Sequence, residues 1–385
     1  MRLGKRYLLV FVAIVVGALA ASPASAAGGS TPQPVASGFD NPRGVAFYHG
    51  DLMVAEAGTG GKNCTTSPPP GTVGAYCFGR TGKISKVDLR TGMHAPFVDN
   101  LFSVAQWVGL PGPAVLGLSG LSSRGSKLMS IEGEYPQLFS NYACAPGDTE
   151  CSADLAAARK EAGALLAVSH AGTFQVVANV GMYDYDKSVN YANQEHDSNP
   201  YGVLAAKDGS YVADAGTNTL DFVSNHGGIT ILYHFPNKYA GFPSDEVPTC
   251  VARAADTLWV ATLSGNLFKV QGTSATQVPE ADLKHVTACA SDRENVYFVN
   301  MWTPNGPPSP HTGNIVKLNA EKGSSSVIAS GLNFPNMDTI GPGGNLYFSA
   351  DSVCAVHGAS PPAPVCPPSG GSVWKLALSH EDDED

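Results

Sequence analysis

The segment Gly313-Asn314-Ile315-Val316-Lys317-Leu318 shows the pattern that decides the fold: glycine, any residue, apolar, any residue, lysine, apolar. Three further segments repeat it, at residues 82–87, 265–270 and 371–376. Alternation of apolar and polar residues is typical of a β-strand with one buried face. The recurrence of one such strand along the chain indicates a repeat architecture.

A second kind of strand precedes the lysine pattern and ends in a small or polar residue. It occurs six times, at residues 53–56, 129–132, 211–214, 259–262, 297–300 and 347–350. A short apolar strand lies before each of these, and it is often opened by proline, as at Pro42, Pro200 and Pro248. The sequence therefore predicts six units of similar build.

A fourth strand follows the lysine pattern, and one copy of it lies at the wrong end of the chain. Residues 326–332 and residues 34–39 have the same pattern, whereas the last unit ends near Leu376 without such a strand. We expect the N-terminal strand to complete the last unit. The prediction is an all-β, six-bladed β-propeller of four-stranded blades, closed in this way. A solenoid is the competing repeat fold, but it would not need this substitution.

Two stretches interrupt the repeats. Residues 61–79 are rich in glycine and proline, and residues 135–162 hold the only helix-like run, at residues 153–161. We interpret both as surface insertions, from the first and the second blade. The abundance of Gly (43) and Pro (28) argues against a helical bundle, because both residues interrupt helices.

The ends of the chain predict export. Arg2, Lys5 and Arg6 precede an apolar stretch that is followed by Ala24-Ser25-Ala26, the pattern of a secretory signal peptide over residues 1–26. No second apolar run follows, so we expect no transmembrane anchor. Residues 27–379 are expected to form one propeller domain, a secreted or cell-surface monomer, and residues 380–385 an acidic, disordered tail. The formal charge of −10 argues against a nucleic-acid-binding surface.

Eight cysteines in an exported chain predict four disulfides. Three pairs flank loops rich in Gly, Pro or Ser, and the fourth pair falls at equivalent positions of consecutive units. The predicted pairs are Cys64 with Cys77, Cys144 with Cys151, Cys354 with Cys366, and Cys250 with Cys289.

The candidate binding face lies where first strands start and second strands end, because both open on one face of a propeller. Amides, carboxylates and one arginine gather there. We take as ligand-binding candidates Asn41, Arg43, Glu56, Asn199, Tyr201, Asp214, Asn336 and Asp338, with Glu132, Thr249, Thr287 and Asn300 beside them. The alternative is that such residues cap turns and satisfy backbone N–H groups.

The densest polar stretch, residues 184–199, offers oxygen ligands and an imidazole at Glu195, His196 and Asp197. Calcium is the metal that such hard ligands would take. The spacing does not match an EF-hand loop, and an ordinary turn between blades is the alternative.

The sequence resembles the ScyD/ScyE family of exported bacterial proteins. The resemblance is carried by residues 38–44, 178–183, 197–203, 212–218 and 247–249. It implies a six-bladed propeller related to NHL repeats and an extracytoplasmic location, but no assigned activity. The longer hairpin that the family carries after Gly265 is absent.

Two functions follow as hypotheses. The first is a binding or scaffold protein that holds a small molecule or an exported protein on the face defined above. The second is a calcium-dependent hydrolase of lactones or esters, like gluconolactonases and paraoxonases, in which the metal polarises a carbonyl and His196 or His285 transfers protons. We prefer binding, because no catalytic motif is present. The hydrolase would require at least three carboxylate or amide oxygens to converge at the channel mouth.

Overall fold

The computed structural model describes residues 30–65, 74–107, 113–238, 245–279 and 283–378. The predicted signal peptide and the predicted acidic tail lie outside these residues. Within them, no helix has the length and apolar character needed to cross a membrane.

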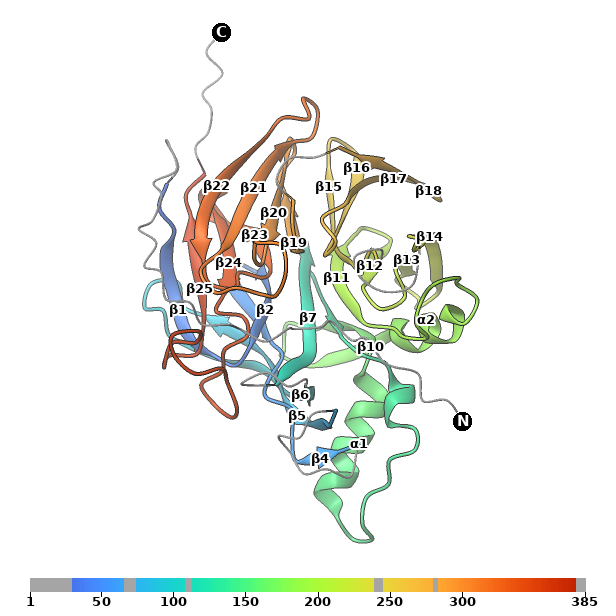
Figure 1. Ribbon diagram of the computed structural model, residues 1–385. Helices are drawn as coiled ribbons and strands as arrows, with labels where there is room; N and C mark the ends of the chain where they lie inside the picture. Colours follow the sequence, from blue (N-terminus) through green and yellow to red (C-terminus); the bar gives the residue numbers. More distant parts are fainter. Residues whose placement is uncertain (1–29, 66–73, 108–112, 239–244, 280–282, 379–385) are drawn as a thin grey trace.

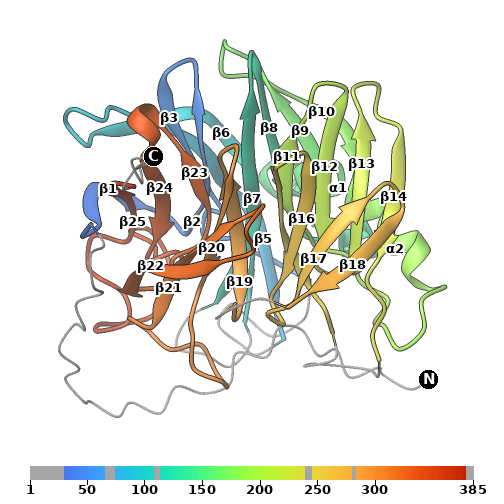
Figure 2. The same cartoon turned by 90° about the horizontal axis from the view of Figure 1, so that it is seen from above.

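The described residues form an all-β propeller with four-stranded blades (Figures 1 and 2). Four blades are separate sheets. Three follow the chain order: β11 (Pro200–Ala205), β12 (Gly209–Asp214), β13 (Thr219–Ser224) and β14 (Ile229–His234); β15 (Pro248–Ala254), β16 (Thr257–Thr262), β17 (Leu267–Gln271) and β18 (Ser274–Val278); β19 (Val286–Ser291), β20 (Asn295–Asn300), β21 (Gly313–Asn319) and β22 (Ser325–Leu332).

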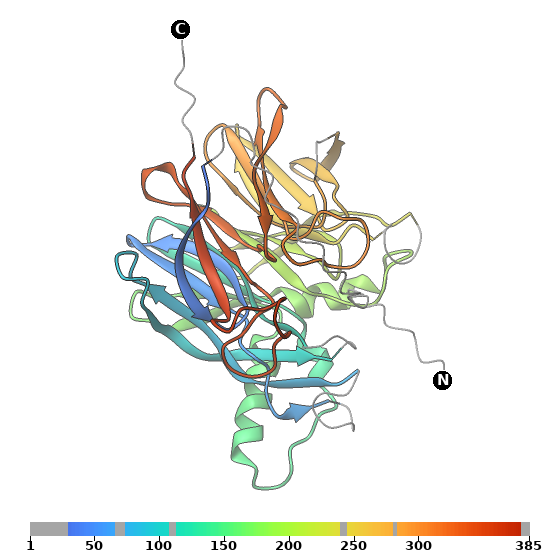
Figure 3. The ribbon, with the colours of Figure 1, turned by 60° about the vertical axis from the view of Figure 1, so that its left-hand side comes forward.

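The fourth separate sheet, which we call the last blade, joins the two ends of the described chain. Its strands are β23 (Asp338–Ile340), β24 (Leu346–Ala350), β25 (Gly371–Leu376) and β1 (Gln33–Phe39). β1 pairs antiparallel with β25, from Gln33 opposite Lys375 to Phe39 opposite Gly371. Figure 3 shows β1 in blue against the red strands of this blade. The N-terminal strand thus occupies the position that the sequence assigned to it.

The other strands form one nine-stranded sheet, so the described residues do not form six separate blades. It contains β2 (Pro42–Tyr48), β3 (Asp51–Glu56), β4 (Asn63–Cys64), β5 (Tyr76–Val87), β6 (His94–Gln106), β7 (Ala114–Arg124), β8 (Lys127–Glu132), β9 (Ala164–Val168) and β10 (Phe174–Asn179). The physical reason is the length of β6 and β7, which pair directly from Ser103 opposite Gly117 to Gln106 opposite Ala114. This pairing joins the strands that the sequence assigned to two separate units.

The two insertions pack on each other and form one side lobe. This lobe contains α1 (Thr149–Glu161) and β4 and projects from the propeller (Figure 1). The lobe has its own core, in which the Phe78 ring meets Phe139 of the short 3-10 helix η1 (Pro136–Phe139) edge-on at 5.1 Å. The sequence predicted two surface insertions, but not their association.

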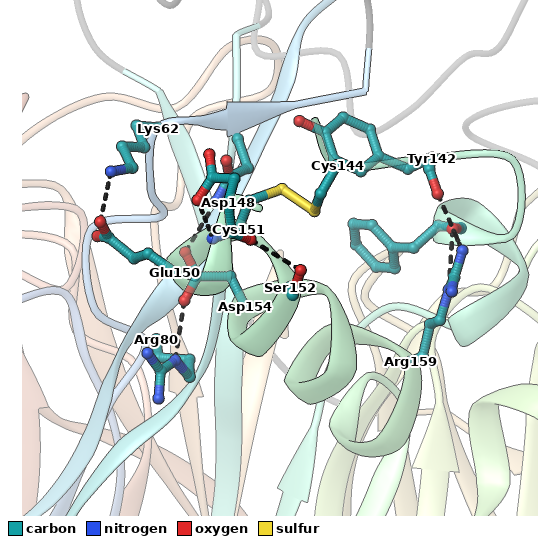
Figure 4. The surroundings of a disulfide bond; sticks show 12 residues. Lys62, Arg80, Tyr142, Cys144, Asp148, Glu150, Cys151, Ser152, Asp154 and Arg159 are labelled. Carbon is teal, nitrogen blue, oxygen red and sulfur yellow. Dashed lines mark hydrogen bonds and ion pairs between the residues drawn. A yellow bond between two sulfur atoms is a disulfide. The ribbon is translucent and has the colours of Figure 1, made fainter. Parts of the chain in front are cut away.

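Polar contacts fix α1 on the lobe (Figure 4). Asp148 caps the helix by accepting a 2.9 Å hydrogen bond from the Cys151 amide. The Asp154 carboxylate accepts hydrogen bonds of 2.8 Å from both Arg80 and Asn63. Asn63 is thus buried and bonded within the lobe.

A second helix, α2 (Val180–Ser188), extends into the polar stretch 184–199, for which the sequence offered a metal site or an ordinary turn but no helix. Asn179 caps it, since its Oδ1 accepts a 2.7 Å hydrogen bond from the Met182 amide. The remaining 3-10 helix, η2, spans Pro342–Gly344. All four predicted disulfides are confirmed: Cys64–Cys77, Cys144–Cys151, Cys250–Cys289 and Cys354–Cys366.

Candidate functional site

Glu56 and Asp214, two of the predicted binding carboxylates, are buried and bonded within their own blades. Glu56 accepts hydrogen bonds from the Asp40 amide (2.8 Å) and the Ser85 hydroxyl (2.5 Å), and Lys83 lies 3.3 Å away. Burial raises the pKa of Glu56 despite these bonds. Its position at the end of β3 therefore clamps the segment that leads into β2.

Asp214 occupies the corresponding place at the end of β12. Its Oδ1 accepts from the amides of Asn199 (2.8 Å), Gly216 (2.9 Å) and Thr217 (2.9 Å), and its Oδ2 accepts a 2.5 Å bond from the Ser198 hydroxyl. Burial raises its pKa, which these four donors lower again in part. The capping alternative describes Asp214 better than ligand binding does.

Asn300, at the end of β20, also accepts a hydrogen bond from a backbone amide, whereas Glu132, at the end of β8, accepts none from the described residues. Oδ1 of Asn300 accepts a 3.0 Å hydrogen bond from the Lys284 amide. Glu132 is fully buried at the end of β8, and among the described residues neither of its carboxyl oxygens has a hydrogen-bond partner. Burial, with the nearby charge of Glu161, raises the pKa of Glu132 well above its ordinary value. This environment therefore favours the protonated form of Glu132.

Tyr201 and Asn336, two of the predicted binding residues, meet through their side chains. The Tyr201 hydroxyl, from the β11–β14 blade, donates a 2.9 Å hydrogen bond to Oδ1 of Asn336 at the entry to the last blade. Beside them, Thr287 donates to the Asn336 carbonyl at 3.4 Å. Thr249 donates to the Val286 carbonyl at 2.6 Å. The polar side chains at this end of the strands are thus largely used to join blades.

The other predicted binding residues are spread over separate contacts. Asn41 donates to the Gly58 carbonyl at 2.8 Å, Asn199 accepts from the Glu134 amide at 3.1 Å, and the half-buried Arg43 donates to the Val115 carbonyl at 3.0 Å. Asp338 is buried, and burial raises its pKa well above its ordinary value. The convergence of oxygens that a calcium-dependent hydrolase would require does not appear in these contacts.

The weak metal candidates also have structural roles. His196 stacks on the Tyr185 ring with centroids 3.8 Å apart, and its Nε2 lies 2.9 Å from the Tyr185 carbonyl. Asp197 accepts a 2.9 Å hydrogen bond from the Ser198 amide. In the part of the chain that the structure describes, no three His, Cys, Asp or Glu side chains, Glu195 included, are grouped to hold a metal ion. His285 is buried against Trp302, with ring centroids 3.9 Å apart.

A pair of carboxyls inside the β11–β14 blade was missed by sequence reasoning. The Thr219 hydroxyl lies 3.2 Å from Oδ2 of Asp184 in α2 and 2.8 Å from Oδ2 of Asp221 in β13. Burial raises the pKa of Asp221 to about 7, and burial together with the Asp221 charge raises that of Asp184 well above its ordinary value. Asp221 gave no signal because it lies in the middle of a strand.

The last blade carries a cavity of about 760 Å³, which the sequence did not predict. A hydrogen-bonded chain of side chains lies along it. Trp374 Nε1 donates to the Ser372 hydroxyl (2.8 Å), and Ser372 donates to Oδ2 of Asp351 (2.5 Å). Oδ1 of Asp351 accepts from Asn333 at 2.7 Å. These donors and acceptors hold one another in fixed positions.

The walls of this cavity come from β1, from β25 and the loop before it, and from nearby loops that contribute Thr91, Gly92, His311 and Asn333. Ser37 and neighbouring residues of β1 form one side, and Cys366 of the Cys354–Cys366 disulfide belongs to the other. Four proline rings line it, those of Pro34, Pro364, Pro367 and Pro368. The sequence signal was the proline-rich loop between two cysteines followed by a tryptophan, but only pairing of β1 with β25 brings its parts together.

Comparison with known proteins supports the fold. The sequence matches no protein-family model and no curated protein. Among solved structures, a protein of unknown function from Bacteroides thetaiotaomicron is 8% identical, with a TM-score of 0.52 over 90% of this chain and 72% of that chain. A gluconolactonase from Xanthomonas campestris is 10% identical, with a TM-score of 0.50 over 90% and 89%. The calcium-binding protein regucalcin from Agrobacterium tumefaciens is 11% identical, with a TM-score of 0.49 over 91% and 94%. At these identities the similarity shows the β-propeller fold alone.

Proposed function

We propose that this protein is an exported β-propeller that binds a small molecule in the cavity of its last blade. The carrying observation is the cavity itself, with the side chains of Trp374, Ser372, Asp351 and Asn333 bonded along it. Its volume lies within the roughly 300–1,000 Å³ of small-molecule sites, which combine apolar walls with a few fixed polar groups. Asn333 directly follows β22, and Asp351 directly follows β24.

The hydrolase hypothesis is weaker on this geometry. Glu56 and Asp214 are occupied by donors of their own blades, and Asp338 is buried. The gluconolactonase from Xanthomonas campestris shares the fold at 10% identity, which carries no activity over to this chain.

We also infer the organisation around this site. Four disulfides favour an oxidising, extracytoplasmic environment, in agreement with a signal peptide over residues 1–26 and a single domain over residues 27–379. The first strands contact one another in succession (β2, β7, β11, β15, β19, β23), and β23 contacts β2. These contacts support counting the nine-stranded sheet as two blades of a closed six-bladed ring. ScyD/ScyE kinship and a monomeric state stay part of this proposal.

The test is a ligand screen that measures the melting temperature and uses variants to locate the binding site. Purified protein with its disulfides formed is heated with a library of metabolites, and hits are titrated by intrinsic tryptophan fluorescence. A ligand of the cavity should raise the melting temperature of the wild type and not that of Trp374→Ala. The matched control is Tyr183→Ala, which removes a half-exposed aromatic ring from α2 and should keep the shift. Hits that stabilise Trp374→Ala as well as the wild type would place binding elsewhere and overturn the proposal.

A further inference from the structure

The lining of the last-blade cavity restricts the chemistry of its occupant. We infer that the ligand is a neutral, hydroxyl-rich ring of the monosaccharide class; this inference rests on the proposed function. The charge, the flat surfaces and the hydrogen-bonding groups of the lining all support a ligand of this class.

The charge of the lining argues against an anion. Among the described residues that line it, Asp351 is the one carboxylate and His311 the one imidazole, and none is a lysine or an arginine. Phosphate and carboxylate groups are normally held by arginine or lysine, which supply charged donors. A phosphorylated or acidic ligand would instead meet the Asp351 carboxylate.

Asp351 also argues against a wholly apolar ligand. Its side chain is buried, and a hydrocarbon laid over it would remove water from a charged group without replacing the lost hydrogen bonds. Each of its oxygens already accepts one hydrogen bond, from Ser372 or from Asn333, and a carboxylate can accept about four in all. The remaining lone pairs suit hydroxyl donors.

Flat, apolar surfaces face the cavity beside these acceptors. The Trp374 indole is half-exposed, and its N–H is bonded to Ser372, so the ring is held in one orientation. The proline rings add further C–H surface, and Ser37, Thr91 and Ser369 add hydroxyl groups. A sugar ring presents a flat face of C–H bonds and a rim of hydroxyls, and it matches both kinds of surface.

The experiment titrates the protein with neutral sugars and with charged probes of similar size. Glucose, galactose, mannose, N-acetylglucosamine and cellobiose are compared with glucose 6-phosphate and with choline, by tryptophan fluorescence and calorimetry. We expect at least one neutral sugar to bind. Glucose 6-phosphate should bind about tenfold more weakly than glucose or not at all. Its phosphate would have no cationic partner in the lining, and the resulting loss of binding free energy is at least that of one hydrogen bond.

Variants separate stacking from hydrogen bonding. Trp374→Ala should weaken sugar binding by about tenfold or more, whereas Trp374→Phe, which keeps an aromatic face, should retain most of it. Asp351→Asn keeps the side-chain shape and suits the left-handed backbone at this position (φ 51°), and it should also weaken binding about tenfold. Tyr183→Ala should bind like the wild type. If Trp374→Ala does not fold, Asp351→Asn and Trp374→Phe carry the test.

The outcomes are distinguishable. If choline or glucose 6-phosphate binds more tightly than every neutral sugar, and Trp374→Phe or Asp351→Asn alters that binding, the sugar inference is wrong and the proposed function stands. If neither these probes nor the wider metabolite library binds, both are wrong.

Discussion

Tyr201 donates a 2.9 Å hydrogen bond to Asn336, which lies 135 residues further along the chain. The two residues belong to the β11–β14 blade and to the entry of the last blade, so the bond connects parts of the propeller that share no sheet. Asn336 is fully buried, its Oδ1 accepts this bond, and within the described residues its Nδ2 has no hydrogen-bond partner.

Removing the Tyr201 hydroxyl should therefore destabilise the protein. Tyr201→Phe leaves the buried Asn336 amide without its partner, and a buried polar group left unsatisfied costs about 1–3 kcal/mol. We expect a loss of that size in the free energy of unfolding measured in urea. Tyr211→Phe is the matched control, because its hydroxyl bonds Arg253 at the exposed surface. Equal losses in the two variants would contradict the role assigned to Tyr201.

Asp214 should tolerate asparagine but not alanine. In Asp214→Asn, Oδ1 can still accept from the three backbone amides and the new NH₂ can donate to Ser198. Asp214→Ala leaves those amides without an acceptor inside the protein, which should cost about 3 kcal/mol or more. Urea denaturation of both variants checks this. A loss with asparagine as large as with alanine would show that the charge itself is required, as a ligand-binding role would demand.

Asp184 and Asp221 should make the stability fall as pH rises. Burial raises the pKa of Asp221 to about 7 in the folded protein, whereas an aspartate of the unfolded chain has the ordinary pKa of 3.8. Between these two pH values the folded protein therefore binds more protons than the unfolded chain. The stabilisation is complete below about pH 4 and is lost as pH rises through about 7. We expect the free energy of unfolding to decrease between pH 5 and pH 8, and Asp184→Asn to flatten this slope. The exposed Asp208→Asn serves as control; a slope identical in wild type and Asp184→Asn would refute the assignment.

The disulfide between Cys354 and Cys366 should support both stability and binding. It closes a loop with a sequence separation of 12, and Cys366 lines the cavity. The variant Cys354→Ala/Cys366→Ala should lose about 3 kcal/mol and bind the cavity ligand more weakly, because the loop wall gains freedom. Cys144→Ala/Cys151→Ala removes a disulfide of the side lobe and should leave ligand affinity unchanged. Urea denaturation and fluorescence titration of both double variants give the comparison, and equal affinity in the two would count against the cavity.

The strand repeats were predictable because they depend on local alternation and on recurrence. Residues 313–318 and 371–376 are found in β21 and β25, and β1 pairs where the missing fourth strand implied. The nine-stranded sheet was not predictable, since it depends on the pairing of β6 with β7 around Ser103 and Gly117. No pattern within either strand specifies that neighbour.

The site was less predictable for a related reason. Asp214 and Glu56 have the residue type and position of ligand-binding carboxylates. In the structure they accept hydrogen bonds from backbone amides of the segments before them. Every residue except proline has such an amide, so the sequence does not show which one will bond a given carboxylate. Asn179 is a residue type typical of helix N-caps, and it does cap α2. The polar residues that follow it favoured a turn or a metal site instead. The cavity joins Ser37, Asn333 and Trp374, which only the paired termini bring together.

The pairing of β1 with β25 also determines when the last blade can form during synthesis. A ribosome produces Gln33–Phe39 early and Gly371–Leu376 only after more than three hundred further residues, so the first strand waits without a partner until the final one arrives. A product cut short before Gly371 has no strand to hold β1 and no wall for the cavity. The last blade can therefore be completed only after Gly371–Leu376 has been synthesised.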